Sequence, residues 1–317
     1  MDLGELEVLV AVAQEKGFSR AAERLRRTQP AVSQAIRRLE EDVGTRLVDR
    51  SSKDGTLTAA GALLYGHAQQ LLNLRRDAEV AIRELRHLYR GRVVVAANEY
   101  TVLHLLEVLA EFRRRHPRIR VEVKRSFASE VPSQVLGRDV DLGIVTYRPL
   151  QPGLTVVPFA SDEIVLLVAP GHPLARRARV SIRDLGDEVF LAHNVRSPHR
   201  ESVVKAFARH RTPLQIVMEL PTLDAIHRLV AAGVGVALGP RRAAEAGIAR
   251  GDVAALTVTD LRLPRPVNLV YRSAEELSHA AAAFVACARE RAAPGPPPAE
   301  PAAHAYPPVR SRRRSPR

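Results

Sequence analysis

The stretch FSRAAERLRRTQPAVSQAIRRLEEDVG, residues 18–44, predicts two short helices joined by a brief turn. In the first helix Ser19 is a candidate N-cap, and apolar and basic residues fall on opposite faces. The predicted inner face holds Ala21, Ala22 and Leu25, and the outer face holds Arg20, Arg24 and Arg27. Because two of the inner residues are alanines, another helix can cross this one closely.

The second helix has distinct start and stop signals. Thr28 is a candidate N-cap, and Pro30 fits a first turn, where its missing N–H removes no intrahelical bond. Gly44 suits the left-handed residue that often ends a helix. The predicted core face consists of Val32, Ile36, Leu39 and Val43.

The polar face of this second helix has an unusual charge order. Ser33, Gln34, Arg37 and Arg38 lie in its N-terminal half, and Glu40, Glu41 and Asp42 gather toward its end. This order opposes the helix dipole, which favours acids at the start of a helix and bases at its end. A helix with Ser, Gln and Arg in its first turns can enter a DNA major groove. An ordinary solvated face is the alternative for the helix taken alone.

The flanking segments predict a winged helix-turn-helix. A helical apolar spacing begins at Leu3, and Gly17 is placed to stop it. After the helix pair, TRLVDRSSKDGTLTAAG, residues 45–61, alternates in polarity and turns at Asp54-Gly55, as a β-wing does. The wing's expected contacts to the DNA backbone or minor groove are Arg50 and Lys53.

The motifs FSRAAERLRRTQPAVSQAIRRLEEDVGTRLVDR, residues 18–50, and LTAAG, residues 57–61, resemble the DNA-binding domain of LysR-type transcriptional regulators. The resemblance implies that Gln29, Pro30, Ser33 and Arg37 face DNA, with Arg50 in the wing. The wing departs from the family's frequent Arg-x-x-Arg-x-x-x-Leu pattern, because the second basic residue is shifted to Lys53. The full set of predicted DNA-binding residues is Ser19, Arg20, Thr28, Gln29, Pro30, Ser33, Gln34, Arg37, Arg38, Arg50 and Lys53.

One long helix is predicted from Thr58 to about Arg90. It divides the chain into a DNA-binding domain of residues 1–58 and a linker of residues 59–90. Its apolar stripe, interrupted at Arg75, consists of Leu64, Ala68, Leu71, Ala78, Ile82 and Leu85. A helix of roughly 45 Å, at 1.5 Å per residue, is too long to bury this stripe against one small winged domain. A partner chain is therefore the predicted cover. The resemblance implies an antiparallel dimer contact here, in a homodimer or homotetramer.

Residues 91–291 predict two linked α/β lobes, because strand-like and helical segments alternate as in βαβ units with a parallel sheet. The predicted strands are GRVVVAAN (91–98), RIRVEVKRS (118–126), DVDLGIVTY (139–147), EIVLLVAP (163–170), EVFLAHN (188–194), LQIVMEL (214–220), GVGVALGP (233–240) and VNLVYR (267–272). Lobe I is expected at about residues 91–160 and 266–291, and lobe II at about 161–265.

The loops at the carboxyl ends of these strands predict a binding site for a small anion or carboxylate between the lobes. Ser129, Ser197 and Thr222 are candidate N-caps whose neighbouring N–H groups would point at the ligand, although each could simply cap its own helix. The expected effector residues are Asn98, Glu99, Tyr100, Thr101, Phe127, Ser129, Thr146, His193, Asn194, Arg196, Ser197 and Thr222.

The segments LAEFRRRHPRIRVEV, DVDLGIV, VAPGHPLA and VAAGVGVALGP are similar to the effector-binding domain of the same LysR family. The resemblance implies a periplasmic-binding-protein fold with an effector between the lobes. The family's Ser/Thr-rich loop after the first strand is here Asn98-Glu99-Tyr100-Thr101. Glu99 thus places an acidic side chain in a pocket that, in the family, usually binds acidic ligands.

Composition limits the other classes of function. No apolar run approaches the roughly 20 residues of a membrane span, and acids occupy the start of the chain, where a signal peptide would be basic. A cytoplasmic location is expected. The lone Cys287 is expected to be a buried structural thiol. The sequence shows no catalytic motif and predicts no metal or cofactor site, which disfavours an enzyme.

The formal charge of +13 does not identify the DNA-binding part, because residues 1–58 hold 10 basic and 10 acidic residues. The Pro-rich residues 292–317 predict a disordered tail, and its basic end could add sequence-blind affinity for phosphates. The sequence thus predicts a LysR-type regulator switched by a small, anionic effector, with operator DNA, a second copy of itself and RNA polymerase as partners. The alternative is a ligand-independent architectural DNA-binding protein.

Overall fold

The computed structural model describes residues 1–49, 55–86, 91–177, 179–195, 198–261 and 263–291. They fall into two compact units. The first unit comprises Met1–Gly91 together with Leu136–Val140, and the second comprises Arg92–Val135 and the chain from Asp141 onward.

The first unit begins with three helices, α1 (Leu3–Glu15), α2 (Phe18–Leu25) and α3 (Gln29–Val43). α1 ends before Gly17, because Lys16 takes the left-handed conformation with φ of 50°. Gly17 is the N-cap of α2, so the prediction that Ser19 caps this helix is wrong. Only Lys16 and Gly17 separate the two helices, and α2 therefore starts before Ser19 can cap it.

α3 begins and ends as predicted. The Thr28 hydroxyl accepts a hydrogen bond from the N–H of Ala31 at 3.4 Å, and Gly44 closes the helix with φ of 74°. Its core residues Val32, Ile36 and Leu39 are buried. Val43 is 40% exposed, so its assignment to the core face is wrong. It lies in the last turn of α3, beyond the point where the core ends.

The wing packs on the same core as the three helices. Its two short segments pair at Val48 and Leu57, and the N–H of Asp49 donates to the carbonyl of Thr56 at 2.8 Å. Arg50 and Lys53, the predicted wing contacts, lie outside the described residues. The core of this unit includes Leu6, Leu9, Val12, Ala21, Ala22, Val32, Ile36, Leu39, Leu47 and Val48.

The long helix α4 (Ala59–Arg86) follows the wing directly. The hydroxyl of Thr58 accepts from the N–H of Gly61 at 3.0 Å. A Cβ on Gly61 would lie 1.9 Å from the carbonyl oxygen of Leu47, so the wing can approach the helix this closely only because Gly61 is glycine. The start of the predicted stripe packs on the winged core through Leu64 and Ala68, and Ala60, one turn before the stripe, packs there too. Farther along, Leu71, Leu74 and Ile82 are 42%, 48% and 53% exposed.

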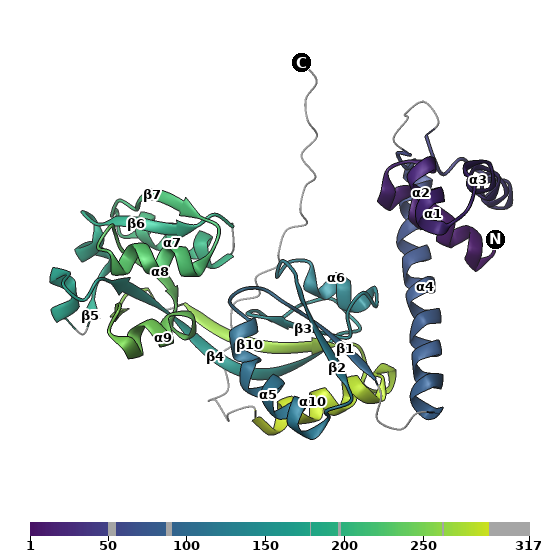
Figure 1. Cartoon of the computed structure of the whole chain (residues 1–317). Helices are drawn as coiled ribbons and strands as arrows, with labels where there is room; N and C mark the ends of the chain where they lie inside the picture. Colours follow the sequence, from purple (N-terminus) through teal and green to yellow (C-terminus); the bar gives the residue numbers. More distant parts are fainter. Residues whose placement is uncertain (50–54, 87–90, 178, 196–197, 262, 292–317) are drawn as a thin grey trace, which may run out of the picture. The chain divides into compact units, whose positions relative to one another are not determined.

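Lobe I of the second unit is built on three parallel strands, β1 (Arg92–Ala97), β2 (Arg120–Arg125) and β3 (Leu142–Val145). Helices α5 (Leu106–Arg115) and α10 (His279–Arg291) cover one face of this sheet, and α6 (Val131–Leu136) covers the other (Figure 1). Cys287 is buried in α10, as predicted, and this burial raises the pKa of its thiol.

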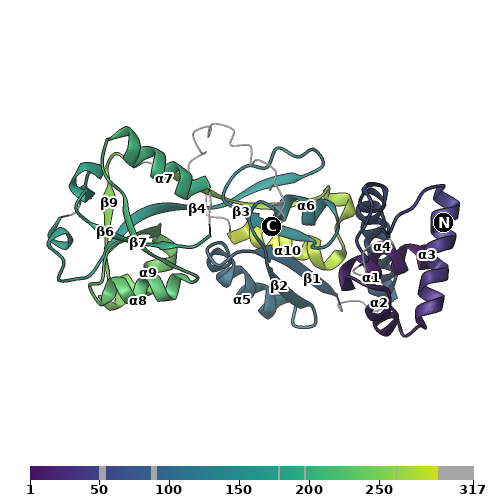
Figure 2. The same cartoon turned by 90° about the horizontal axis from the view of Figure 1, so that it is seen from above.

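Lobe II contains β5 (Arg179–Val180), β6 (Val189–His193), β7 (Gln215–Leu220), β8 (Ala237–Pro240) and β9 (Ala254–Val258). Its strands lie between α7 (Pro198–Arg209) on one side and α8 (Leu223–Ala231) and α9 (Arg241–Arg250) on the other (Figure 2). Each side has its own hydrophobic core. Short 3-10 helices span Val102–His104, Pro173–Arg176, Ile182–Leu185 and Ala274–Glu276 in the two lobes.

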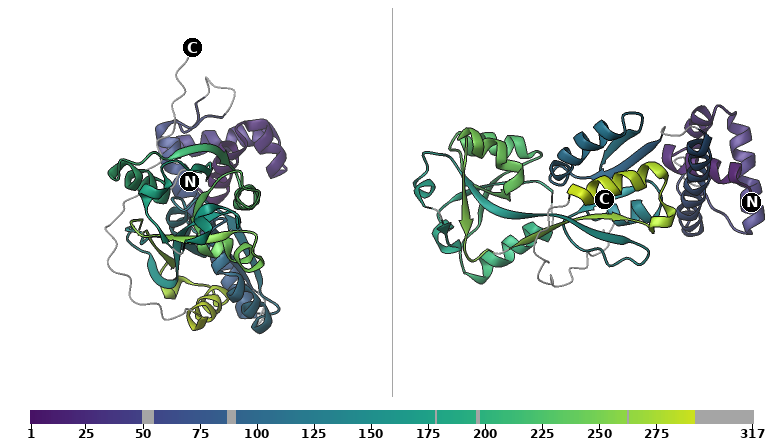
Figure 3. Two further views of the ribbon diagram at one scale, coloured as in Figure 1. Left: turned by 90° about the vertical axis from the view of Figure 1, so that its left-hand side faces the viewer. Right: turned by 90° about the horizontal axis from the view of Figure 1, so that it is seen from below.

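Two long strands, β4 (Thr155–Val168) and β10 (Pro264–Tyr271), pair antiparallel and run from one lobe into the other (Figures 1 and 3). The sheet order is β2-β1-β3-β10-β4-β9-β5, with β8 also paired to β4. The sheet is therefore mixed, whereas the sequence predicted parallel pairing alone. The predicted two-lobed α/β fold is confirmed, but its two connecting strands pair over a longer stretch than the predicted segments 163–170 and 267–272.

Candidate functional site

The exposed face of α3 carries most of the residues predicted to contact DNA. Gln29, Pro30, Gln34 and Arg37 are exposed, and Ser33 is half-buried beside them. These side chains occupy the first turns of the helix, where N–H groups and the positive end of the dipole also favour phosphate. The N-terminal half of α3 therefore presents hydrogen-bonding side chains together with the positive charge of Arg37. This combination suits binding to DNA.

Two other predicted DNA contacts have partners inside the winged domain. Arg20 donates to the carbonyl oxygens of Glu15 and Lys16, and thereby caps the C-terminus of α1. Arg38 is 59% exposed, and its Nε lies 3.8 Å from a carboxylate oxygen of Glu5. Arg20 would have to leave these carbonyls to reach a phosphate.

The acids at the end of α3 have two different roles. Glu40 is buried, and its Oε1 accepts hydrogen bonds from the N–H groups of Leu47 and Val48 at 2.9 and 3.2 Å. Glu40 therefore holds the first strand of the wing, which corrects its predicted place on the polar face. Glu41 and Asp42 are exposed, and Asp42 pairs with the N-terminal amino group.

In lobe I, the carboxyl ends of β1, β2 and β3 bring several predicted effector residues to one edge of the sheet. Asn98 follows β1, and its Oδ1 accepts from the N–H groups of Tyr100 and Thr101 at 3.0 and 2.9 Å. The Thr101 hydroxyl, which is completely buried, accepts from the N–H of Asn98 at 3.0 Å. The loop is thus held together by hydrogen bonds among its own polar groups. Thr146, after β3, is buried at the same edge.

Glu99 extends from this loop into lobe II. Its Oε1 accepts from the N–H of Leu223 at 2.8 Å, and its Oε2 lies 3.3 Å from Nε2 of His193. Thr222 caps α8 as predicted, with its hydroxyl accepting from Ala225 at 3.3 Å. The first N–H of α8, expected to face a ligand, is therefore taken by the chain's own carboxylate.

The other predicted effector residues are more scattered. Ser129 does not cap α6, because this helix begins two residues later, at Val131. The turn between Phe127 and Glu130, closed by a 2.9 Å backbone hydrogen bond, occupies the position expected for the helix start. Phe127 is 56% exposed, and Asn194 is also exposed. Arg196 and Ser197 lie outside the described residues.

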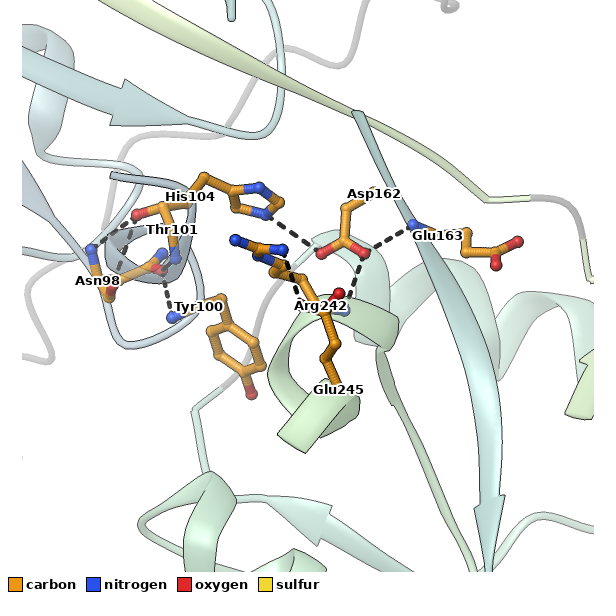
Figure 4. Close-up of polar contacts among 8 residues, drawn as sticks. All are labelled: Asn98, Tyr100, Thr101, His104, Asp162, Glu163, Arg242 and Glu245. Atoms are coloured by element: carbon orange, nitrogen blue, oxygen red, sulfur yellow. Dashed lines mark hydrogen bonds and ion pairs between the residues drawn. The ribbon is translucent and has the colours of Figure 1, made fainter. Parts of the chain in front are cut away.

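A second polar cluster joins the lobes at His104 and Asp162 (Figure 4). Nε2 of His104 lies 3.3 Å from Oδ2 of Asp162, and both side chains are almost fully buried. Oδ1 of Asp162 accepts from the N–H groups of Glu163 at 2.9 Å and Arg242 at 3.3 Å. Burial works to raise the pKa of the Asp162 carboxyl, but His104 and the charge of Arg265 outweigh it and lower the pKa overall. Asp162 thus stays ionised at neutral pH.

Tyr100 lies between the two clusters and packs on the core of lobe II. Its ring centroid is 5.6 Å from the ring of His193 and 5.6 Å from the guanidinium carbon of Arg265. Burial, together with the charge of Glu99, raises the pKa of the Tyr100 hydroxyl to about 12. Tyr100 therefore stays a neutral hydrogen-bond donor at physiological pH.

Sequence reasoning missed His104, Asp162, Arg242 and Arg265. The available signals were weak: Asp162 and Glu163 interrupt an apolar strand, and Arg265 stands between two prolines. Neither pattern names a partner. The four residues come together only in the folded chain, where the paired strands β4 and β10 run from one lobe to the other beside the loop that follows β1.

A winged helix-turn-helix, a long helix and a two-lobed α/β domain with polar clusters between its lobes define a class of protein. They are the parts of a DNA-binding regulator with a separate sensing domain. Two family models match this division: "Bacterial regulatory helix-turn-helix protein, lysR family" over residues 3–62, and "LysR substrate binding domain" over residues 86–293. The chain belongs to the LysR family of transcriptional regulators.

Similar proteins in other organisms are named as transcriptional regulators. A probable RuBisCO transcriptional regulator of Synechocystis sp. is 30% identical over 290 residues, which cover 89% of this chain and 84% of the relative. The HTH-type transcriptional regulator CysL of Bacillus subtilis is 27% identical over 267 residues, covering 84% and 89%. These matches confirm the predicted regulator and give no support to the architectural alternative.

Solved structures show the same fold. CbnR, a LysR family transcriptional regulator, has a TM-score of 0.68 at 23% identity, over 92% of this chain and all of CbnR. A full-length OxyR variant from Pseudomonas aeruginosa also scores 0.68 at 23% identity, over 91% and 95% of the two chains. Among the described residues, no helix is both long and apolar enough to cross a membrane.

Proposed function

We propose that this LysR-type regulator binds operator DNA through the first turns of α3 and responds to a small anionic effector between its lobes. The observation that carries the proposal is the arginine-bearing exposed face of α3, joined in one chain to lobes whose polar contacts converge on Glu99 and Asp162. In this proposal residues 1–58 form the DNA-binding domain, 59–90 the dimerisation helix and 91–291 the effector domain, and the protein acts in the cytoplasm.

Recognition of DNA would divide between two kinds of contact. Gln29, Ser33, Gln34 and Arg37 would meet base edges and nearby phosphates in a major groove. Arg38, beyond them on the same face, would bind backbone phosphate. The wing's Arg50 and Lys53 and the basic tail, residues 292–317, would add further phosphate contacts, which depend strongly on salt.

Arg37 provides the direct test of this surface. Selection of genomic fragments by the purified protein would first define the operator. The substitution Arg37→Ala is then expected to weaken operator binding by about 5- to 150-fold, equivalent to about 1–3 kcal/mol. Binding would be measured by fluorescence anisotropy at fixed salt.

Arg183→Ala, which removes an exposed arginine from lobe II, is the matched control. It is expected to leave operator binding close to that of the wild-type protein. An equal loss in both variants would show that overall charge, and not the α3 surface, determines the affinity.

The effector would bind where the loop after β1 meets lobe II, and it would act by changing the population of lobe arrangements. Thermal melting against sulfate, sulfite, O-acetylserine and aromatic acids tests for such a ligand. At 100 times its Kd a ligand adds about 2.7 kcal/mol of stability. We expect Tyr100→Ala to lose this gain and keep operator binding, and Arg37→Ala to do the reverse. If Tyr100→Ala kept the gain, the ligand would bind elsewhere.

Self-association would complete the regulator. The exposed apolar residues Leu71, Leu74 and Ile82 continue the stripe by which α4 packs on the winged domain. A second copy of α4 would remove these side chains from water, at about 25 cal/mol per Å² of apolar surface. A dimer would also present two copies of α3 to successive grooves of a palindromic operator.

A further inference from the structure

Arg265 has an unusual position for a cation. It lies on β10 directly opposite Asp162 of β4, where these two strands cross between the lobes. Arg265 as a whole is only 5% exposed. Opposed residues of an antiparallel pair place their side chains on the same face of the sheet, so Arg265 shares a face with Asp162. The loop after β1 closes over this face, because Tyr100 lies against the guanidinium.

The guanidinium lacks the partners that a buried cation normally has. Its Nε is buried without a hydrogen-bond acceptor among the residues that the structure describes. Both oxygens of Asp162 already accept from other groups, namely His104, Glu163 and Arg242. Burial lowers the pKa of Arg265, although the charge of Asp162 opposes the change. Buried donors in folded proteins are almost always hydrogen-bonded, so an acceptor from outside the chain is expected here.

Three other donors at the junction are occupied. The first N–H of α8 donates to Glu99, and His193 faces the same carboxylate. His104 is engaged by Asp162. Nε of Arg265 is thus a buried donor between the lobes that still lacks an acceptor among the described residues. A planar guanidinium binds carboxylate, phosphate or sulfate oxygens through paired hydrogen bonds.

We infer that Arg265 is the anion-binding residue of the effector site and that the effector is a small organic molecule with a single oxyanion group. This inference rests on the proposed effector response and specifies its chemistry. The single charge follows from the two carboxylates nearby, Glu99 and Asp162, which repel a polyanion. Tyr100, a neutral donor beside the guanidinium, adds a hydrogen bond or a ring face to the rest of the molecule.

The test compares Arg265→Met, Arg265→Lys and the matched control Arg183→Met in the full-length protein. Arg183 is an exposed arginine of lobe II. The probes are benzoate, acetate, inorganic phosphate and sulfate, with neutral benzamide as reference, all at constant ionic strength in sodium chloride. The melting temperature is measured for each protein with and without each probe.

We expect at least one oxyanion to raise the melting temperature of the wild-type protein and of Arg183→Met, with no rise from benzamide. Arg265→Met should lose the rise, and Arg265→Lys should retain part of it. Without any probe, Arg265→Met should melt close to the wild-type temperature, because removing a buried donor without an acceptor offsets the loss of the charge that favours ionised Asp162.

Four outcomes would overturn the inference. One is an oxyanion response that survives in Arg265→Met. Another is a probe-free Arg265→Met that melts well below the wild-type protein, which would make Arg265 a structural counter-ion of Asp162. The third is a wild-type protein that responds to no oxyanion. A response to benzamide in both wild type and Arg265→Met would retain an effector site and reject its anionic chemistry. Operator binding in the same samples shows separately whether the regulator itself is functional.

Discussion

At the scale of single residues, Glu40 shows how a charged side chain can be part of the fold. Its carboxylate accepts two N–H groups of the wing, so Glu40→Ala leaves the buried donors of Leu47 and Val48 without this acceptor. We expect the substitution to lower the free energy of unfolding by about 1–3 kcal/mol. Urea denaturation measures the change, and Glu41→Ala, at the exposed neighbouring position, is the control. Equal stabilities of the two variants would contradict this role.

Asp162 should make the stability of the second unit depend on pH. Its pKa is lowered in the folded chain from an ordinary value of 3.8, so it stabilises the fold above that pH. The contribution disappears as pH falls through the lowered folded pKa. Asp162→Asn should therefore destabilise the protein at pH 7 and differ less from wild type at pH 3.

Chemical denaturation at the two pH values checks this expectation. Asp224→Asn, at a side chain that is 74% exposed, is the control and should have little effect at either pH. A destabilisation by Asp162→Asn of the same size at both pH values would show that ionisation of Asp162 is unimportant.

At the scale of elements, the packing of α4 on the wing depends on Gly61. A methyl group at this position would meet the Leu47 carbonyl oxygen at 1.9 Å and force backbone to move. Gly61→Ala is therefore expected to destabilise the winged unit by about 3 kcal/mol. Gly66 lies in the same helix with no atom within 4 Å of such a methyl group. Gly66→Ala should stabilise the helix by about 0.5–1 kcal/mol.

The two alanine variants form a matched pair, since both gain the same helix propensity and differ only in what the new methyl group meets. Calorimetric melting temperatures should move in opposite directions. A rise in both would mean that the wing can shift away from α4 at little cost.

At the scale of the whole molecule, the exposed part of α4 predicts an oligomer. Leu71→Glu places a charge in the apolar stripe, where a partner helix would bury it without a counter-ion. We expect this variant to sediment as a monomer at concentrations where the wild-type chain associates. Ala62→Glu adds the same charge to an exposed position elsewhere on α4 and should associate like wild type. Sedimentation velocity distinguishes these outcomes, and an associated Leu71→Glu would move the interface elsewhere.

Features that depend on neighbouring residues in the chain were predicted correctly more often than features that depend on other elements. Thr28 and Gly44 were predicted as the ends of α3 because capping depends on the residue and its immediate neighbours. The prediction that Ser19 is the N-cap of α2 is wrong, since the start of α2 depends on where α1 ends. The prediction that Val43 belongs to the core face of α3 is also wrong, because periodicity identifies a face of a helix but not the point where the core beneath it ends.

The sequence by itself determined the class of each domain: helical spacing, caps and a turn define the winged helix-turn-helix, and alternating strands and helices define the two lobes. Only the tertiary structure decided what the polar residues do. It placed Glu99 at the start of α8, Glu40 under the wing, and Arg265 opposite Asp162. The physical reason is that secondary structure depends on local chain geometry, whereas the partners of these polar residues lie on other segments that folding brings together, 7 residues away in the chain for Glu40 and 124 residues away for Glu99.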